Sequence, residues 1–231
     1  MATRDTLLAV PVLGAIVRRV IRAARARAFP GSGNYWERRY RQGDNSGAGS
    51  YGRLAAFKAE VLNEFVAAND ISSVVELGSG DGAQLQLADY PDYTGVDVAQ
   101  TCVDQCRRLF ADDASKRFVH NDDLAKVEPH ELALSLDVVY HLVEDEVFER
   151  YMADLFRLAT RFVIVYASNI DKSHAVHVRH RRFTDWVDHH AENWSLIETI
   201  PNRYPAAPGD ETDDTSFADF YVFAPRRSNH T

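Results

Sequence analysis

The segment Glu76-Leu77-Gly78-Ser79-Gly80-Asp81-Gly82 decides the fold of this chain. A short β-branched run, residues 73–77, leads into it, and a short helix is expected after it, so the glycines occupy a strand-to-helix turn. Glycine permits positive φ angles and lets a ligand approach the backbone, while the free N–H groups at a helix start attract a polar or anionic group. The segment therefore predicts a ligand-binding turn in an α/β domain.

Two kinds of ligand fit this turn. Asp97 ends the next predicted strand, nineteen residues after Gly78, where a carboxylate accepts hydrogen bonds from both hydroxyls of a ribose. Gly78, Gly80 and Ala83 also match the dinucleotide fingerprint, so an NAD-binding domain is an alternative. Glu76 favours a different ligand, because an acid two residues before the turn has no role with a pyrophosphate but pairs with the ammonium group of an amino-acid moiety.

Strand and helix patterns alternate on both sides of this turn. The predicted helices are 54–67, a short one after the turn, 103–110 and 147–158, and the predicted strands are 73–77, 93–98, 117–120, 132–139 and 161–167. This alternation predicts a parallel sheet with helices on both faces. The tail holds two further strands, 195–200 and 217–224, with no helix between them, which predicts a terminal hairpin with one antiparallel strand.

Composition places the chain among ordinary globular proteins. Its 231 residues are 45% hydrophobic and 26% charged, enough for one α/β domain (53–231) after an N-terminal segment (1–52). Cys102 and Cys106, spaced i,i+4, are expected to pack inward as small hydrophobic side chains; with only two cysteines, we expect a reducing compartment, the cytoplasm. The sequence contains no apolar run of the ~20 residues that a transmembrane helix needs.

The charge is distributed unevenly along the chain. Residues 1–41 carry nine arginines and two acids, a net +7, whereas the rest carries 17 basic and 32 acidic residues, a net -15. An acidic body repels a phosphate backbone, which argues against nucleic acid as a substrate. The apolar stretch 7–17 followed by arginines predicts a basic amphipathic helix. Such a helix contacts a membrane surface peripherally, or docks on its own domain or on a second subunit of a homodimer.

Residues 31–52 are rich in glycine and aromatic side chains. A glycine-rich loop of this length is typically disordered or functional, and its aromatic clusters favour a flap that closes over a site. Tyr35, Trp36 and Tyr51 offer flat surfaces for stacking on a sugar or for sheltering a cation, although aromatic residues of this kind also serve simply as packing.

The glycine motif, Asp97 and the terminal hairpin together resemble the class I S-adenosylmethionine-dependent methyltransferases over residues 53–225. The resemblance implies a Rossmann-like seven-stranded sheet with one antiparallel strand, helices on both faces and S-adenosyl-L-methionine as cofactor. It also implies a contact for each candidate residue: Glu76, Gly78, Ser79 and Gly80 with the methionine end, Asp97 with the ribose, Val98 with the adenine, Asp122 with the adenine amine, and Asp137 facing the transferable methyl group.

A narrower resemblance concerns the acceptor. Segments 34–40, 137–145 and 179–186 resemble bacterial methyltransferases of glycan biosynthesis, including the sugar 1-O-methyltransferases of mycobacterial methylmannose polysaccharide synthesis. This implies O-methylation of a small saccharide. The alternatives are a methyltransferase for a non-sugar metabolite and a non-catalytic cofactor-binding protein of the same fold. The candidate substrate-binding residues are Tyr35, Trp36, Tyr51, Tyr140, His174, His177 and Arg179.

A sugar hydroxyl must lose its proton during attack, so a base is expected beside the methyl group. Asp137 and His141 lie four residues apart at the carboxyl end of a predicted strand, and the unperturbed pKa of a histidine lies close to neutral pH. His141 is therefore the candidate base, although it could instead pack against the next helix, and Asp137 is a base, an orienting group or a metal ligand. A Mg²⁺ site at Asp137 and His141, with Glu144 and Asp145, is one alternative, and helix capping by the carboxylates is the other.

Overall fold

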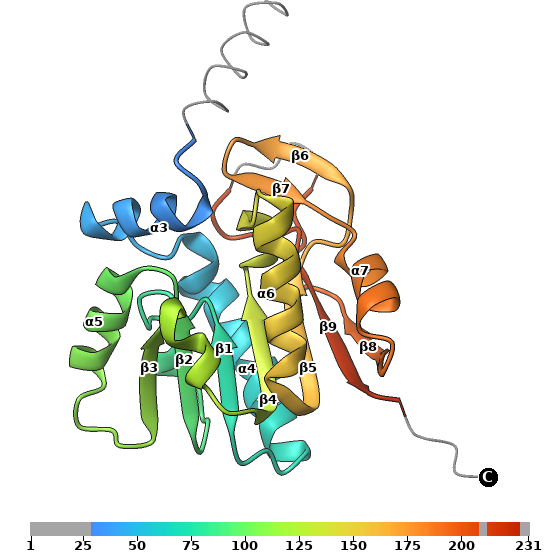
Figure 1. Ribbon diagram of the computed structural model, residues 1–231, viewed down its shortest axis with the longest axis horizontal. Coiled ribbons are helices and arrows are strands. Elements are labelled where there is room, and N and C mark those ends of the chain that lie inside the picture. The colour runs from blue at the N-terminus through green and yellow to red at the C-terminus, as the bar shows by residue number, and fades with distance from the viewer. Residues whose placement is uncertain (1–28, 208–211, 227–231) are drawn as a thin grey trace, which may run out of the picture.

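The computed structural model describes residues 29–207 and 212–226, and a seven-stranded sheet forms its centre (Figure 1). The strands follow the order β3-β2-β1-β4-β5-β9-β8. β1 to β5 are parallel, and β9 runs antiparallel to both of its neighbours, which confirms the predicted terminal hairpin and Rossmann-like sheet. The bounds are β1 Val74–Leu77, β2 Tyr93–Asp97, β3 Lys116–His120, β4 His130–Leu136, β5 Ala159–Ala167, β8 Trp194–Ile200 and β9 Asp219–Pro225.

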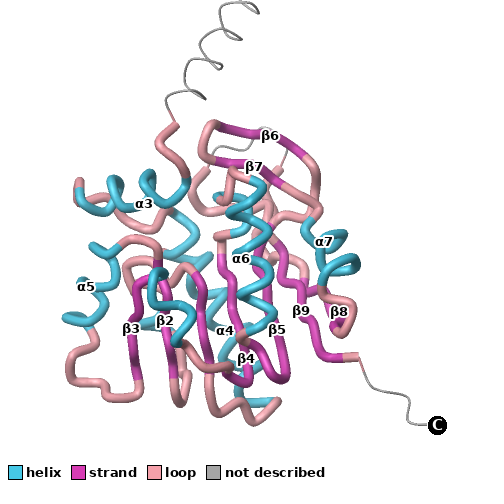
Figure 2. The backbone as a smooth tube through the Cα atoms, in the orientation of Figure 1, coloured by secondary structure: helices cyan, strands magenta, loops and turns pink. Residues whose placement is uncertain are grey.

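Helices cover both faces of the sheet, as the side chains of each strand dictate (Figure 2). Val74 points to a core shared with α4 (Gly52–Ala68) and α5 (Gln100–Leu109), while its neighbour Val75 points to a second core beneath α6 (Asp145–Arg157) and α7 (Phe183–His190). Alternate residues of a strand point to opposite faces, so this sheet needs apolar residues at successive positions. The predicted short helix after the glycine turn is a single 3-10 turn, η2 (Leu85–Leu87).

The expectation of a loop throughout 31–52 is wrong for half of that segment. Residues Ser32–Arg41 form helix α3, and Ala48–Ser50 form the 3-10 turn η1. Between Gly31 and Gly43 only one glycine, Gly33, interrupts residues that favour a helix. Tyr40 and Trp36 on one side of α3 pack against Ala99 and Cys102 of the α5 region, and this burial stabilises the helix.

The chain after β5 is also more regular than expected. No strand is predicted between residues 167 and 195, yet this segment contains a hairpin, β6 (Lys172–Ala175) paired with β7 (Val178–His180). β4 ends at Leu136 and not at residue 139, because Asp137 has a φ of 60° and turns the chain out of the strand. The 3-10 turn η4 (Val139–His141) follows at once, and η3 (Asn121–Lys126) occupies the corresponding place after β3.

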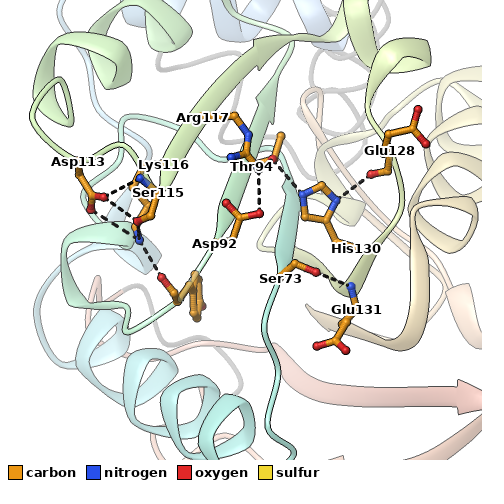
Figure 3. Close-up of polar contacts among 11 residues, drawn as sticks. Ser73, Asp92, Thr94, Asp113, Ser115, Lys116, Arg117, Glu128, His130 and Glu131 are labelled. Atoms are coloured by element: carbon orange, nitrogen blue, oxygen red, sulfur yellow. Dashed lines mark hydrogen bonds and ion pairs between the residues drawn. The ribbon is translucent and has the colours of Figure 1, made fainter.

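The two edges of the sheet have different roles. Helix α3 and the β6–β7 hairpin lie beyond the carboxyl ends of the parallel strands (Figure 1). The amino ends carry polar contacts that connect neighbouring strands (Figure 3). His130 bonds through Nε2 to Thr94 Oγ1 (3.0 Å) and through Nδ1 to the carbonyl of Glu128 (2.8 Å), and Arg117 pairs with Asp92 (2.9 Å). Open α/β sheets bind their ligands at the carboxyl edge.

Three sequence expectations concern features outside the sheet. Cys102 and Cys106 are buried free thiols on the inner face of α5, as their spacing predicts. Among the described residues, no helix combines the length and the apolar character needed to cross a membrane. The predicted basic amphipathic helix, with its stretch 7–17, lies outside the described residues.

Candidate functional site

A cavity of about 680 Å³ opens at the carboxyl edge of the sheet. Its walls come from the ends of β1, β2 and β4, from α3 and α4, and from η3 and α6. All seven predicted cofactor residues and both predicted catalytic residues line it: Glu76, Gly78, Ser79, Gly80, Asp97, Val98, Asp122, Asp137 and His141. Residues 65 positions apart in the chain therefore meet in one chamber. Their roles toward a ligand remain predictions.

The glycine turn lines this cavity, and a side chain added at Gly78 or Gly80 would meet neighbouring atoms. Gly78 has a φ of 85°, and a Cβ added to it would lie 2.4 Å from Val138 Cγ2. Gly80 has a φ of 60°, and its Cβ would lie 2.5 Å from Ser46 Oγ. The turn thus needs glycine both for its backbone angles and for the close approach of the β4 end and residue 46.

Part of the predicted flap fastens onto this turn. The Ser46 amide donates to Asp81 Oδ2 (2.8 Å), and the Asp81 amide donates back to Ser46 Oγ (2.9 Å). The Tyr51 hydroxyl also donates to Asp81 Oδ2 (2.6 Å), and Tyr40 shares a hydrogen bond with Ser46 (3.0 Å). The segment after α3 therefore covers the glycine turn, and Tyr51 serves this attachment and does not line the cavity.

Asp97 is held in position by backbone groups. Its Oδ2 accepts from the Gly80 amide (2.9 Å) and its Oδ1 accepts from the Ala99 amide (2.8 Å). Each carboxylate oxygen retains a further lone pair, so both can accept from a ligand in the cavity. Burial raises the pKa of Asp97, and the two amide contacts oppose this rise. A ligand that donates two hydroxyl hydrogens, such as a ribose, would stabilise the ionised form.

Glu76 is a buried carboxyl at the end of β1, with 4% of its surface exposed. The Tyr93 hydroxyl donates a hydrogen bond to its Oε2 (2.7 Å). Burial raises its pKa to about 7, against the opposing effects of Tyr93 and the nearby charge of Lys58. Because burial disfavours the ionised carboxylate, a cationic partner would stabilise it. Glu76 therefore fits an ammonium group and not a phosphate.

Asp137 is held by two side chains, one of which the sequence did not reveal as part of the site. Tyr140 donates to its Oδ1 (2.7 Å), and Lys58 of α4, only 1% exposed, contacts its Oδ2 (2.7 Å). A signal for Lys58 existed, since it lies four residues from both Leu54 and Leu62 on the apolar face of its helix. A lysine is rarely fully buried unless it is paired, so its place on that face marked it as functional or paired.

His141 presents a defined tautomer to the site. Its Nδ1 lies 3.1 Å from the backbone carbonyl of His177. A carbonyl only accepts, so Nδ1 carries the hydrogen and Nε2 keeps its lone pair. Burial lowers the pKa of His141 to about 4, so the ring is neutral at pH 7. The edge-to-face contact with Trp36 (4.9 Å between ring centroids) fixes its orientation.

Of the predicted substrate residues whose side chains the structure describes, only Trp36 lines the cavity. Tyr35 stacks on His177 (4.9 Å, 14° between planes), whose ring is in turn nearly parallel to that of His141. Tyr140 is buried behind Asp137. Arg179 forms an ion pair with Asp145 (2.9 Å) and donates a hydrogen bond to the carbonyl of Val143. The side chain of His174 lies outside the described part of the structure.

The four predicted metal ligands do not converge. Asp137 pairs with the cation of Lys58, Glu144 accepts two hydrogen bonds from Ser32, and Asp145 binds Arg179 and Arg181. Over residues 29–207 and 212–226, no group of three or more His, Cys, Asp or Glu side chains is arranged to hold a metal ion. The expectation of a Mg²⁺ site is not supported, because protein cations and donors already occupy these carboxylates.

Comparisons with known proteins bear on the fold. No family profile and no curated protein sequence matches this chain. Its structure is similar to the methyltransferase domain of bacterial CtHen1-C, with a TM-score of 0.57 and 16% identity over 73% of this chain and 96% of that one. It is similar to the magnesium protoporphyrin IX methyltransferase of Synechocystis solved with SAH, with a TM-score of 0.56 and 15% identity over 75% of this chain and 84% of that one. It also resembles the N-methyltransferase NodS of Bradyrhizobium japonicum with SAH, with a TM-score of 0.57 and 14% identity over 75% of this chain and 87% of that one. The chain has the class I methyltransferase fold.

The close approach at the glycine turn can be tested by Gly78→Ala. Gly47→Ala is a matched control, because Gly47 also has a positive φ (90°) but nothing lies within 4 Å of its added Cβ. We expect Gly78→Ala to reduce the free energy of unfolding by about 1–3 kcal/mol more than Gly47→Ala, the usual effect of overpacking. Urea unfolding of both variants measures the difference, and equal losses would contradict the contact with Val138.

The raised pKa of Glu76 predicts how stability depends on pH in the protein without ligand. The folded state holds the proton more tightly than the unfolded state, whose pKa is near 4.5, so stability falls as pH rises from about 4.5 to 7. The loss should reach roughly 3 kcal/mol and be absent from Glu76→Gln. Denaturant titrations across pH measure it, with Glu64→Gln on the exposed face of α4 as control. A parallel pH profile for wild type and Glu76→Gln would contradict the burial effect.

Proposed function

We propose that this protein is an S-adenosylmethionine-dependent O-methyltransferase that acts on a hydroxyl of a small saccharide. One observation carries the proposal: Glu76, Asp97 and Asp122, at or just after the ends of β1, β2 and β3, line the same cavity as Asp137 and His141. Glu76 is suited to an ammonium, Asp97 to a ribose and Val98 to the face of an adenine, which together describe an amino-acid nucleoside. The buried carboxyl of Glu76 beside this turn disfavours the pyrophosphate of a dinucleotide.

The methyl donor, when bound, supplies a methyl group on a positively charged sulfur. An acceptor oxygen forms a bond to the methyl carbon as the carbon–sulfur bond breaks, and the acceptor proton must leave. His141 is the proposed base, because its Nε2 keeps a lone pair while Nδ1 is fixed on the His177 carbonyl. The main contribution of the chain is to align donor and acceptor at the strand ends. Asp137, fixed by Lys58 and Tyr140, is the proposed orienting group there.

The acceptor side supports a ring-shaped hydroxyl compound. Trp36 offers an aromatic surface next to His141, and Ser50 adds a hydroxyl group to the same cavity. A flat aromatic face and a hydroxyl group suit a sugar ring. Because Arg179 is engaged by Asp145, the polar segment after β5 contributes less to this side than the sequence indicated. Trp36 equally suits a phenolic ring, so a phenol O-methyltransferase is the second candidate.

Two experiments test the proposal. Calorimetry should show binding of S-adenosylhomocysteine and no binding of NAD. An acceptor screen with methyl-labelled S-adenosylmethionine, sugars and oligosaccharides first and phenols second, should show transfer to a saccharide. Binding of NAD in place of the nucleoside would overturn the proposal, and transfer to phenols alone would establish the second candidate.

Asp97→Asn should weaken S-adenosylhomocysteine binding by about 1–3 kcal/mol, because one acceptor for the ribose hydroxyls becomes a donor. The control Asp112→Asn removes an exposed acid after α5 and should leave affinity unchanged. Calorimetric titration of both variants, checked for folding by circular dichroism, measures the difference. An unaltered affinity in Asp97→Asn would remove Asp97 from the site.

His141→Ala should lower kcat by at least about 100-fold while leaving S-adenosylhomocysteine affinity intact, as expected for a general base. Because burial lowers the pKa of His141 to about 4, kcat at saturating donor should stay level from pH 8 down to about 5. The exposed His189→Ala on α7 is the control. Full activity in His141→Ala, or a loss of wild-type kcat centred at pH 6.5, would end the base assignment.

A further inference from the structure

Lys58 has unused hydrogen-bonding capacity inside the cavity. The side chain of Lys58 is 1% exposed and lines the cavity, yet among the described residues its ammonium group donates only to Asp137 Oδ2. An ammonium carries three donors, and the face of Tyr166, 5.3 Å away, attracts its charge without accepting a conventional hydrogen bond. Unsatisfied donors on a buried cation are costly unless a ligand or water accepts them.

Gln84, in the same cavity, has an acceptor that lacks a hydrogen-bond donor. Its Nε2 donates to the carbonyl of Ala55 on α4 (3.1 Å), which turns Oε1 the other way. Oε1 is buried and has no hydrogen-bond partner in the described structure. Gln84 as a whole is only 8% exposed and lines the cavity. A buried, unpartnered carbonyl oxygen at a ligand cavity calls for a donor from the ligand.

Glu76 connects these two observations. It lines the same cavity, and it is close enough to Lys58 for the lysine charge to oppose the rise of its pKa. The three side chains therefore combine two acceptors, Glu76 and Gln84 Oε1, with one cationic donor, Lys58. Acceptors suit an ammonium and a cationic donor suits a carboxylate, which are the two charged groups of an α-amino acid.

We propose that Lys58 and Gln84, neither of them part of the glycine turn, are specificity residues for the amino-acid end of the cofactor. Lys58 donates to its α-carboxylate, and Gln84 Oε1 accepts, with Glu76, from its α-ammonium. This inference rests on the proposed function. Lys58 also donates to Asp137. Its ammonium group would therefore contact both the α-carboxylate of the cofactor and the residue that we propose orients the acceptor.

Four ligands separate the two contacts in the wild-type protein. S-adenosylhomocysteine carries both charged groups, its decarboxylated analogue keeps the ammonium, its deaminated analogue keeps the carboxylate, and 5′-methylthioadenosine has neither. Calorimetry should rank S-adenosylhomocysteine above both single-charge analogues by about tenfold or more each, since hydrogen bonds to charged groups are the strong ones.

Two variants should separate the carboxylate contact of Lys58 from the ammonium contact of Gln84. Lys58→Met should weaken S-adenosylhomocysteine and the deaminated analogue by about 10- to 100-fold and leave the decarboxylated analogue within about twofold. Gln84→Leu should weaken S-adenosylhomocysteine and the decarboxylated analogue by about tenfold and spare the deaminated one. Lys172→Met and Gln86→Leu, both at exposed positions, are the matched controls. If Lys58→Met does not fold, Lys58→Arg and the wild-type ligand series still test the contact.

Three results would contradict the roles of Lys58 and Gln84 or the proposed function. Equal wild-type affinity for S-adenosylhomocysteine and its decarboxylated analogue overturns the role of Lys58 while the proposed function stands. A uniform loss for all four ligands in either variant shows a structural effect and overturns the assignment of that residue. Failure of wild type to bind any of the four overturns the proposed function itself.

Discussion

Three carboxylates gathered at one edge of the sheet are the constraint on which the site depends. Glu76, Asp97 and Asp137 stand at or just after the ends of β1, β2 and β4, which are neighbours in the sheet. Of the three, only Asp137 forms an ion pair within the described residues. Burial raises the pKa of both Glu76 and Asp97, so the cavity contains two acids whose negative charge is poorly compensated by other side chains. A ligand that brings positive charge and hydroxyl hydrogens relieves this cost, and a diphosphate increases it.

The remaining parts of the chain enclose this acidic edge. Helix α3 packs on α5, the segment after it bonds to Asp81, and the β6–β7 hairpin brings the His177 carbonyl to His141. The carbonyl of His177 orients the ring of His141, and burial lowers the pKa of that ring. A neutral imidazole therefore lies near the ion pair of Asp137 and Lys58.

Lys58 links the two halves of the chamber. It comes from a helix that otherwise packs as core, and it reaches Asp137 beside the glycine turn. Breaking a buried pair of this kind exposes an unpaired charge to a low dielectric, so the lysine and the aspartate depend on one another. Asp137 also adopts a left-handed backbone conformation, φ 60°, a strained geometry that surrounding contacts must maintain and that is common at functional sites.

Local pattern was enough to predict β1 to β5, their helices, the terminal hairpin and the glycine turn, because apolar periodicity and glycine act over a few residues. It also located Glu76, Asp97 and Asp137, since parallel strands deliver their carboxyl ends to one edge. It did not predict helix α3, the β6–β7 hairpin or the pairing of Lys58 with a residue 79 positions away. Those features are stabilised by contacts between distant segments, and only the folded chain decides which distant side chains meet.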